Sequence, residues 1–380
     1  MHLTKRTAIL PPATIGIIGG GQLGQMMALS AKSMGYKVGV LDPTPQSPAG
    51  QVSDFQIVAD YDDQAAMDTL IQKSDVLTYE FENVSTKTLA QLNKQQLPQG
   101  VKLLEITGNR LNEKNFLRDH GIKTAPFAAV TDAASFTAAV QTVGLPAILK
   151  TTEGGYDGHG QVDINTPADF AAGAALYAQT PCILEGRVDF EKEVSVMVTQ
   201  TANQDIRVFP VVENQHRAHI LQTSIAPARL SDVVAQKVQV FAMAIADGLD
   251  LAGVLGIECF VTAQGTVLVN ELAPRPHNSG HYSIEACNIS QFEAHIRSIC
   301  GLPIPEIQQN QPAVMFNLLG DELSRARQAL AQRPNWHFHD YGKAEIRDLR
   351  KLGHVTILGP DLAALIQEAT DFENQEGYFE

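Results

Sequence analysis

Two glutamates in one short hairpin have the type and spacing that a divalent cation requires. The stretch GIECFVTAQGTVLVNE ends on Glu271, and Gln264-Gly265 in its middle is typical of a two-residue turn. Centring the turn there pairs Phe260 with Val269 and Glu258 with Glu271, which places the glutamate Cβ atoms roughly 5 Å apart. Opposed carboxylates repel each other unless a cation bridges them, and Mg²⁺ prefers such oxygen ligands. The hairpin is therefore a candidate Mg²⁺ site for a nucleotide's phosphates; the alternative is a bulge that turns one carboxylate to water.

A glycine-rich loop at 151–161 (TTEGGYDGHGQ) is a candidate phosphate-binding flap. Its glycines leave many backbone amides free, which suits a segment that closes over phosphates. Lys150 ends the preceding predicted strand, where its ammonium could meet them. No Walker A sequence is present, and the alternative is a solvent-exposed hairpin loop.

The loop APRPHNSGH follows the second glutamate of the hairpin by two residues. It carries Arg275, His277 and Asn278 on a backbone shaped by proline and glycine. Such a density of hydrogen-bonding side chains beside a metal indicates substrate binding, because loops on a rigid scaffold usually hold substrates. The alternative is a merely solvated loop.

The pattern Gly19-x-Gly21-x-x-Gly24 follows a predicted strand, and Asp42 ends the next one. This arrangement fits the dinucleotide-binding fingerprint. The alternative is a tight strand–helix turn whose amides bind another anion or nothing.

Three charged segments are ambiguous by themselves. Two of them could bind a nucleotide, with backbone groups on its base and a carboxylate on its ribose: residues 185–188 with 191–193, and residues 213–217. Charged side chains beside strands are, however, usually exposed to solvent. The third is a cluster of basic residues near the end of the chain, which includes Lys343, Arg350 and Lys351. This cluster either binds a phosphate group or is ordinary surface charge.

Composition excludes several classes of protein. The 380 residues carry 28 Lys and Arg against 42 Asp and Glu, a formal net charge of −14. This acidity argues against nucleic acid or an anionic membrane as partner, although a small anionic substrate needs only local cations. The 4 cysteines show no metal-ligand spacing and read as reduced. Neither a signal peptide nor an apolar run of about 18 residues is found, so we expect a soluble, cytoplasmic α/β protein of several domains.

Strands alternate with helical segments over residues 1–108, which predicts a parallel sheet. Its strands are expected at 13–19, 37–41, 57–58, 76–79 and 103–107. Further strands are expected at 147–151, 161–164, 183–184, 194–198, 207–212 and 256–271, and helices at 111–120, 169–179 and 231–247. The tail from about 305, with strands near 314–318 and 354–358, predicts a third, smaller domain.

Motifs along nearly the whole chain resemble one family. They are GGGQLGQM (19–26), YEFENV (79–84), GYDGHGQ (155–161), FEKEVS (190–195), ECF…NELAPRPHNSGH (258–281) and YGK…RKLGH (341–354). The sequence resembles the N5-carboxyaminoimidazole ribonucleotide synthetases, the ATPase or carboxylase subunits of purine biosynthesis in the ATP-grasp superfamily. The resemblance implies a Rossmann-like N-terminal parallel sheet at 1–108 that binds no dinucleotide, an ATP-grasp module at 109–302 and a small C-terminal β domain at 303–380. The module would comprise a glycine-rich-loop subdomain at about 124–183 and a metal-binding subdomain at about 184–302.

The resemblance also implies roles for individual residues. ATP would contact Arg110, Lys150, Gly155, Tyr156, Asp157, Gly158, His159, Gly160, Gln161, Glu185, Gly186, Arg187, Val188, Glu193, His216, Asn270 and Glu271. Mg²⁺ would bind Glu258 and Glu271. 5-Aminoimidazole ribonucleotide would contact Gln22, Leu23, Glu80, Lys343, Arg350 and Lys351. Bicarbonate and carboxyphosphate would lie among Arg275, His277 and Asn278, and Asp157 and His277 are the candidate bases.

The sequence departs from the family pattern at three positions. His159 stands where the glycine-rich loop often has Lys or Arg, so a fixed positive charge over the phosphates is lost. Ala273 stands where many ATP-grasp enzymes have Asn. Asn270 precedes the second glutamate instead and would face the other way in a regular strand.

The predicted activity is ATP-dependent carboxylation of 5-aminoimidazole ribonucleotide with bicarbonate, which gives ADP and phosphate through carboxyphosphate. The resemblance further implies a homodimer that passes its product to a separate mutase. A formate-dependent glycinamide ribonucleotide transformylase would share the metal hairpin but not the RPHNSGH loop. An NAD-dependent oxidoreductase would use the GxGxxG pattern and leave the glutamate pair unexplained. A non-enzymatic nucleotide-binding module is opposed by the full set of candidate catalytic groups.

Overall fold

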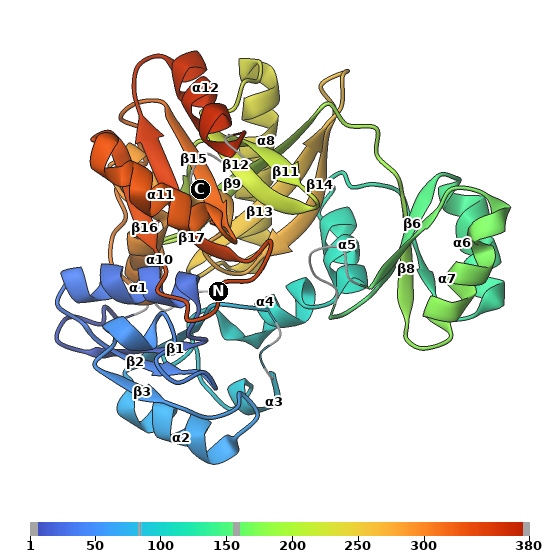
Figure 1. The fold of residues 1–380 in the computed structure, drawn as a ribbon. Helices are drawn as coiled ribbons and strands as arrows, with labels where there is room; N and C mark the ends of the chain where they lie inside the picture. The colour runs from blue at the N-terminus through green and yellow to red at the C-terminus, as the bar shows by residue number, and fades with distance from the viewer. Residues whose placement is uncertain (1–6, 83, 85, 155–159, 375–380) are drawn as a thin grey trace.

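The computed structural model describes residues 7–82, 84, 86–154 and 160–374. Its N-terminal part is a parallel sheet of order β3-β2-β1-β4, formed by β1 (Thr14–Ile18), β2 (Lys37–Leu41), β3 (Phe55–Ile57) and β4 (Val76–Tyr79) (Figure 1). The helical segments α1 (Gln22–Ser33), η1 (Gly50–Val52), α2 (Gln64–Lys73) and α3 (Thr86–Leu89) accompany it. The parallel sheet predicted from alternating strands and helices is confirmed.

Residues 103–107, predicted as a fifth strand of this sheet, instead lie in helix α4 (Gly100–Thr107), so that prediction is wrong. A short apolar run does not distinguish strand from helix. Leu103 packs into the core beneath the central sheet and Leu104 into the core of the N-terminal sheet, so the helix joins the two. Helix α5 (Arg110–Asp119) follows directly, and the side chain of Asn109 caps its first N–H groups.

A small antiparallel sheet forms the lobe at the right of Figure 1. Its order is β5-β8-β6-β7, from β5 (Phe127–Val130), β6 (Ala147–Thr151), β7 (Gln161–Ile164) and β8 (Cys182–Gly186). The helical segments α6 (Ala133–Val143), η2 (Pro167–Asp169) and α7 (Phe170–Tyr177) belong to the same lobe. Residues 155–159 of the glycine-rich loop lie outside the described part of the chain.

The large central sheet has the order β14-β13-β9-β11-β12-β15-β17-β16, with β10 on β9. Its strands are β9 (Lys192–Gln200), β10 (Ile206–Val208), β11 (Val212–Arg217), β12 (Ile220–Ala226), β13 (Val254–Val261), β14 (Val267–Ala273), β15 (Ala313–Leu319), β16 (Trp336–Asp340) and β17 (Lys351–Leu358). The single strand predicted at 207–212 is therefore wrong, because the chain leaves β10 and re-enters the sheet as β11. The C-terminal strands continue the same sheet through the pairing of β12 with β15.

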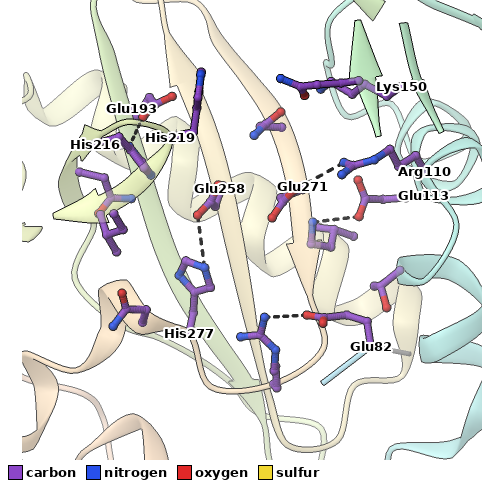
Figure 2. A pocket seen from close by; sticks show the side chains of 18 of the residues that line it. Glu82, Arg110, Glu113, Lys150, Glu193, His216, His219, Glu258, Glu271 and His277 are labelled. Atoms are coloured by element: carbon purple, nitrogen blue, oxygen red, sulfur yellow. Dashed lines mark hydrogen bonds and ion pairs between the residues drawn. The ribbon is translucent and has the colours of Figure 1, made fainter. Parts of the chain in front are cut away.

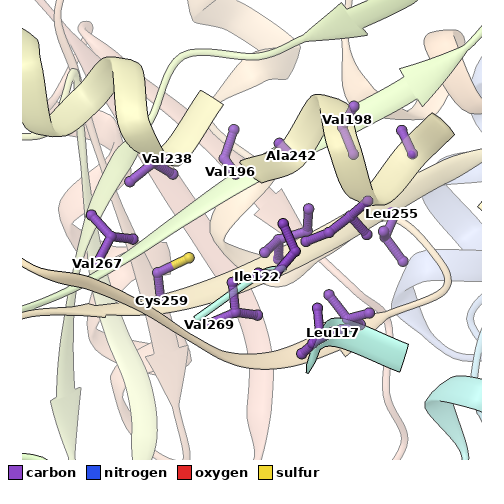
Figure 3. Close-up of a cluster of buried hydrophobic side chains, with 14 of the residues drawn as sticks. Leu117, Ile122, Val196, Val198, Val238, Ala242, Leu255, Cys259, Val267 and Val269 are labelled. Atoms are coloured by element: carbon purple, nitrogen blue, oxygen red, sulfur yellow. The ribbon is translucent and has the colours of Figure 1, made fainter. Parts of the chain in front are cut away.

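Helices cover this sheet and connect its strands. They are α8 (Asp232–Leu249), η3 (Asn278–Gly280), α9 (Ser283–Ala286), α10 (Gln291–Ile299), α11 (Glu322–Ala329), η4 (Leu330–Gln332) and α12 (Leu362–Glu373). Helix α8 buries Val238 and Ala242 at helical spacing against alternate residues of β9, such as Val196 and Val198, and against Leu255 of β13 (Figure 3). This packing gives the hairpin β13–β14, which carries Glu258 and Glu271, a rigid base.

The structure confirms the mixed α/β class expected from the sequence. Among the residues described, no helix has the length and apolar character needed to cross a membrane.

Candidate active site

A cavity of about 1000 Å³ lies where the three sheets approach one another (Figure 2). It collects many of the residues predicted for catalysis and binding, from α1 to β17. Those on its wall are Gln22, Leu23, Arg110, Lys150, Gln161, Glu193, His216, Glu258, Asn270, Glu271, Arg275, His277, Asn278 and Lys351. Other predicted residues lie off this wall, namely Glu80, Gly160, Glu185, Gly186, Arg187, Val188, Lys343 and Arg350. Gly155, Tyr156, Asp157, Gly158 and His159 lie outside the described residues.

Glu258 and Glu271 are opposed across β13 and β14, as predicted, but the strand register between them and the turn differs from the predicted one. Phe260 pairs with Leu268 rather than with Val269, because the hairpin loop is one residue longer than a two-residue turn and Gly265 takes a positive φ of 70°. A bulge between the pairs of Glu258 and Cys259 then restores the register.

Asn270 is the extra residue of this bulge. It has no partner in the register, and both Asn270 and Glu271 line the cavity. The expectation that Asn270 faces the other way is therefore wrong, because alternation along a strand fails at a bulge.

Helix α5 holds the backbone on both sides of Glu271. Lys114 Nζ donates to the carbonyl oxygen of Asn270 at 2.6 Å, and Glu113 Oε2 accepts from the N–H of Leu272 at 2.9 Å. Burial raises the pKa of Glu113 to about 8. Neither residue was predicted for the site, and their only signal in the sequence is a pair of adjacent opposite charges.

The glutamate pair has the electrostatics of a cation site. Burial, followed by the charge of Glu271, raises the pKa of Glu258 to about 7. His277 Nε2 lies 3.2 Å from Glu258, and Arg110 lies 3.6 Å from Glu271. Within the described ranges, no three His, Cys, Asp or Glu side chains are placed to hold a metal ion. A cation between the two carboxylates would thus take its other ligands from phosphate oxygens and water.

Cations of the small lobe and of α5 lie around one buried carboxylate. Lys150 Nζ lies 2.8 Å from Glu185, which is buried behind the wall, and Lys114 lies 3.9 Å from the same carboxylate. Burial alone would raise the pKa of Glu185, but the two ammonium groups outweigh it and lower the pKa to about 2. Across the cavity, His216 of β11 and Glu193 of β9 form a separate ion pair on the central sheet (Figure 2).

The glycine-rich turn after β1 binds carboxylates of the protein itself. The N–H groups of Gly21 and Gly24 each donate to Glu80 at 2.5 Å, and Gly20 donates to Asp42 at 2.7 Å. A Cβ at Gly19 would lie 2.2 Å from the Glu80 side chain, so this position requires glycine. Binding of a dinucleotide at this turn is therefore not favoured. The backbone N–H groups that would bind its phosphates, and Asp42, already form hydrogen bonds within the protein.

The loop after β16 contacts α1 and η1, which follow this turn in the chain. Gln25 and Gln51 donate to the carbonyl oxygens of Tyr341 and Gly342, at 3.4 and 3.0 Å. Lys343 follows in the same loop, and burial lowers its pKa to about 8. Segments far apart in the sequence thus place Lys343 near Glu80.

Two groups of the APRPHNSGH loop are held by neighbours that the sequence did not indicate. Arg275 pairs with Glu82 at 2.8 Å. The amides of Asn278 and Asn317 exchange hydrogen bonds of 3.0 and 2.7 Å, so the Asn278 side chain is anchored in the sheet. Burial, then the charge of Arg275, holds the pKa of His277 well below its usual range.

Comparison with known proteins covers nearly the whole chain. Family models match for a ribonucleotide synthetase preATP-grasp domain (residues 12–103), an ATP-grasp domain (115–292) and a phosphoribosylaminoimidazole carboxylase C-terminal domain (313–368). The chain is 47% identical over 375 residues to the N5-carboxyaminoimidazole ribonucleotide synthase of Bacillus subtilis, covering 98% of this chain and 99% of the relative.

Solved structures agree with these matches. An ADP complex of an N5-carboxyaminoimidazole ribonucleotide synthetase is similar with a TM-score of 0.93 and 47% identity, over 96% of this chain and 97% of that chain. The Aspergillus clavatus N5-carboxyaminoimidazole synthase in complex with ADP and 5-aminoimidazole ribonucleotide is similar with a TM-score of 0.87 and 32% identity, over 95% of this chain and 98% of that chain.

Proposed function

The chain belongs to the N5-carboxyaminoimidazole ribonucleotide synthases of the ATP-grasp superfamily, and from this premise we propose how its cavity is divided among the substrates. It is an ATP-dependent ligase that carboxylates 5-aminoimidazole ribonucleotide in purine biosynthesis. The observation that carries the division is the opposed pair Glu258 and Glu271, which faces the same cavity as Lys150 and Arg275.

ATP occupies the end of the cavity beside the small lobe. Arg110 and Lys150 contact its phosphates, residues 155–161 cover them, and residues 185–188 hold the adenine. Glu193 and His216 contact the ribose. Asn270 stands beside Glu271 at the phosphates, which its place in the bulge supports.

Glu258 and Glu271 would hold Mg²⁺ together with the phosphates of ATP. The two carboxylates fit this ion, because they are hard oxygen donors whose mutual repulsion a cation relieves. When bound, Mg²⁺ supplies neutralisation of charge on the phosphates during transfer.

5-Aminoimidazole ribonucleotide lies along Gln22, Leu23 and Glu80, with its 5′-phosphate on Lys343, Arg350 and Lys351. The contacts of α1 and η1 with the loop after β16 support this, because they bring the basic Lys343 close to the acidic Glu80. The Aspergillus clavatus structure holds the same ribonucleotide with ADP.

Bicarbonate lies among Arg275, His277 and Asn278, between the two nucleotides. One of its oxygens attacks the γ-phosphorus of ATP, the bond to ADP breaks, and carboxyphosphate forms. Positioning and charge neutralisation by Lys150 and Arg275 do most of this work. Carboxyphosphate then breaks its C–O bond to give CO₂ and phosphate. The ribonucleotide amine forms the N–C bond and loses a proton to a base, for which Asp157 and His277 are the candidates.

Three further properties belong to this proposal. The domain limits are 1–108, 109–302 and 303–380, and the three matched family models lie within them. The enzyme works in the cytoplasm as a homodimer. Its product passes to a separate mutase.

ADP release tests the substrate assignment. With Mg²⁺ and bicarbonate, we expect release to rise sharply when 5-aminoimidazole ribonucleotide is added and to fall when bicarbonate is stripped. Stimulation by glycinamide ribonucleotide with formate, and none by this pair, would overturn the assignment.

A further inference from the structure

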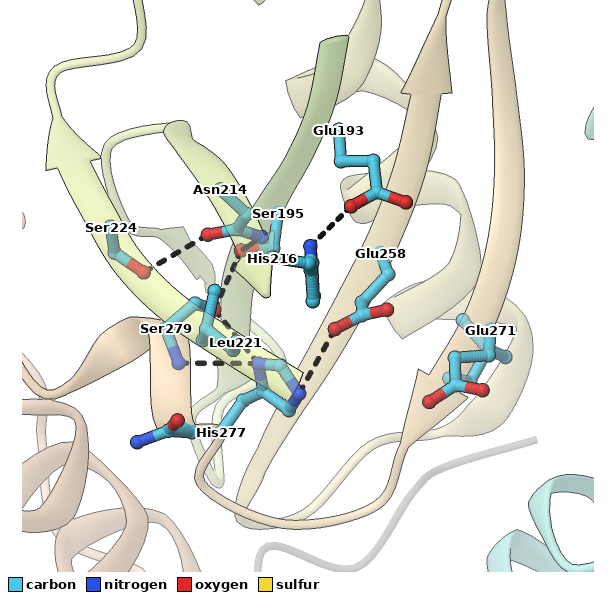
Figure 4. A network of polar contacts seen from close by, with 12 residues as sticks. Glu193, Ser195, Asn214, His216, Leu221, Ser224, Glu258, Glu271, His277 and Ser279 are labelled. Atoms are coloured by element: carbon cyan, nitrogen blue, oxygen red, sulfur yellow. Dashed lines mark hydrogen bonds and ion pairs between the residues drawn. The ribbon is translucent and has the colours of Figure 1, made fainter. Parts of the chain in front are cut away.

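Both ring nitrogens of His277 have a polar neighbour, Glu258 at Nε2 and Ser279 at Nδ1 (Figure 4). On the cavity side, Nε2 lies 3.2 Å from Glu258 Oε1. On the opposite side, Nδ1 lies 2.7 Å from Ser279 Oγ, which points away from the cavity into the sheet. Which nitrogen carries the proton depends on the direction of these two contacts.

A buried chain of side chains leads away from Ser279. Ser195 Oγ donates to Ser279 Oγ at 2.6 Å, and Asn214 Nδ2 donates to Ser195 Oγ at 2.9 Å. At the far end, Ser224 Oγ donates to Asn214 Oδ1 at 3.0 Å. The three serines are fully buried and Asn214 is 6% exposed, so water has little access to these hydrogen bonds.

This chain has a direction, because an amide nitrogen can only donate. Asn214 donates to Ser195, so the Ser195 hydroxyl hydrogen is directed to Ser279. Ser279 already accepts from Ser195, so its own hydrogen is directed to His277 Nδ1. Nδ1 must then be an acceptor.

A second observation gives the same direction independently of any hydroxyl rotor. The backbone N–H of Ser279 lies 3.4 Å from His277 Nδ1, and a backbone N–H can only donate. Both groups at Nδ1, the Ser279 hydroxyl and the Ser279 N–H, therefore favour the proton on Nε2.

We propose that Asn214, Ser195 and Ser279 are positioning residues whose hydrogen-bond relay fixes His277 in the tautomer that carries its proton on Nε2. This inference rests on the proposed place of His277 beside bicarbonate. In this tautomer, Nε2–H is the donor that His277 presents to the cavity, and it passes from Glu258 to an oxygen of bicarbonate or carboxyphosphate when these bind. It offers no lone pair to the cavity, so it is not the base that takes the amine proton.

Nuclear magnetic resonance tests the relay directly. In protein labelled with ¹⁵N-histidine, long-range ring correlations distinguish the two tautomers, and His277→Gln identifies the His277 signals by their loss. We expect the Nε2–H pattern in the wild-type protein. An Nδ1–H pattern there would overturn the proposal whatever the activity.

Asn214→Asp reverses the polarity of the relay, because a carboxylate accepts where the amide donated. We expect the His277 signals to change towards Nδ1–H and kcat to fall by about tenfold or more, with the KM for ATP little changed. Ser224→Ala is the matched control, since it shortens the chain without reversing it, and should leave both the tautomer and kcat near wild type. Equal effects of the two substitutions would mean that the chain has only a structural role.

Ser279→Ala and Ser195→Ala serve if the buried carboxylate prevents folding. Ser195→Ala frees the Ser279 hydroxyl hydrogen to rotate but keeps both donors to Nδ1, so it should give a smaller shift towards Nδ1–H than Ser279→Ala. Ser279→Ala leaves only the backbone N–H and should give a mixture of tautomers. An unchanged pattern in Ser279→Ala would contradict the relay.

Substitution of His277 separates the relay from the proposed function. We expect His277→Ala to lower kcat by about 100-fold, the scale of one lost transition-state donor, and His277→Gln to recover about tenfold because its amide also donates. Equal loss in both variants would indicate a base and overturn the donor role. Full activity of His277→Ala alongside the Nε2–H pattern would instead mean that the proposed bicarbonate site is wrong.

Discussion

Lys114 donates to the carbonyl oxygen of Asn270 at 2.6 Å, and Asn270 is the residue that the hairpin bulge leaves without a strand partner. The next peptide along is held in the same way, since Glu113 accepts from the N–H of Leu272. Two adjacent residues of α5 therefore complete the hydrogen bonding that the bulge interrupts. The position of Glu271 between these two peptides depends on a helix far from it in sequence.

Lys114→Met should weaken metal binding as well as stability. It leaves a buried carbonyl unpaired and removes a cation from Glu185, which we expect to cost about 1–3 kcal/mol of unfolding free energy. Because the bulge then loses its anchor, the Mg²⁺ concentration for half-maximal ADP release should rise. Lys102→Met, at an exposed position of α4, is the control. Lost stability with an unchanged Mg²⁺ requirement would show that Lys114 does not position Glu271.

Glu258→Gln should have opposite effects on activity and on stability. Without metal, it removes one of two opposed carboxylates and should stabilise the protein by about 0.5–1 kcal/mol. With Mg²⁺ and ATP, the loss of a ligand should lower kcat by about 100-fold. Thermal unfolding with and without Mg²⁺, together with ADP release, checks both. A lower Tm in the absence of metal would contradict the repulsion between Glu258 and Glu271.

Affinity for the ribonucleotide phosphate should depend on the charge of Lys343. Burial, followed by the charge of Arg350, lowers the pKa of Lys343 to about 8. The ammonium is present below this pH and is lost above it, so the KM for 5-aminoimidazole ribonucleotide should rise as pH increases through 8. Lys343→Arg keeps its charge in this range and should flatten the profile. A wild-type KM that is constant from about pH 7 to 9 would exclude this role.

Buried neutral histidines should make the fold sensitive to acid. Burial lowers the pKa of His295 to about 3 and places those of His281 and His354 well below the usual range. The unfolded chain binds protons near pH 6.5, so below that value each such histidine removes up to about 1.4 kcal/mol of stability per pH unit. Urea unfolding at several pH values measures this slope.

His295→Gln should reduce that slope, whereas His337→Gln, at an exposed position, should not. His295 accepts from the N–H of Val254 at 3.0 Å, a contact that a Gln side chain can also make. The same slope in both variants would mean that other groups control acid unfolding.

The pairing of Glu258 with Glu271 was predicted from the position of the hairpin turn, but the bulge that completes this pairing could not be predicted from the sequence. Their opposition is confirmed although the predicted turn was one residue too short, because the bulge at Asn270 corrects the register. The hairpin sequence itself carries no signal for this bulge, which is held by Lys114 and Glu113 of α5. Motif spacing therefore finds the opposed glutamate pair, whereas the groups that position it come from tertiary packing.

The misread helix has a similar cause. Residues 103–107 are apolar enough for a strand, and only the two cores on either side of α4 decide in favour of a helix. The strands and helices with clear periodicity, such as β2 and α8, were predicted from the sequence and are confirmed. Glu82 and Ser279 stand in the quoted motifs but were given no role, because their partners, Arg275 and Ser195, are brought to them only by the fold.

Transfer of oxygen from bicarbonate to phosphate tests the central claim most directly. The enzyme would be incubated with ATP, Mg²⁺, 5-aminoimidazole ribonucleotide and ¹⁸O-labelled bicarbonate, and the released phosphate analysed by mass. Attack of bicarbonate on the γ-phosphorus predicts that each phosphate carries one labelled oxygen, because the C–O bond of carboxyphosphate is the bond that breaks. Unlabelled phosphate released in step with ADP would contradict the account, since water would then be the attacking group.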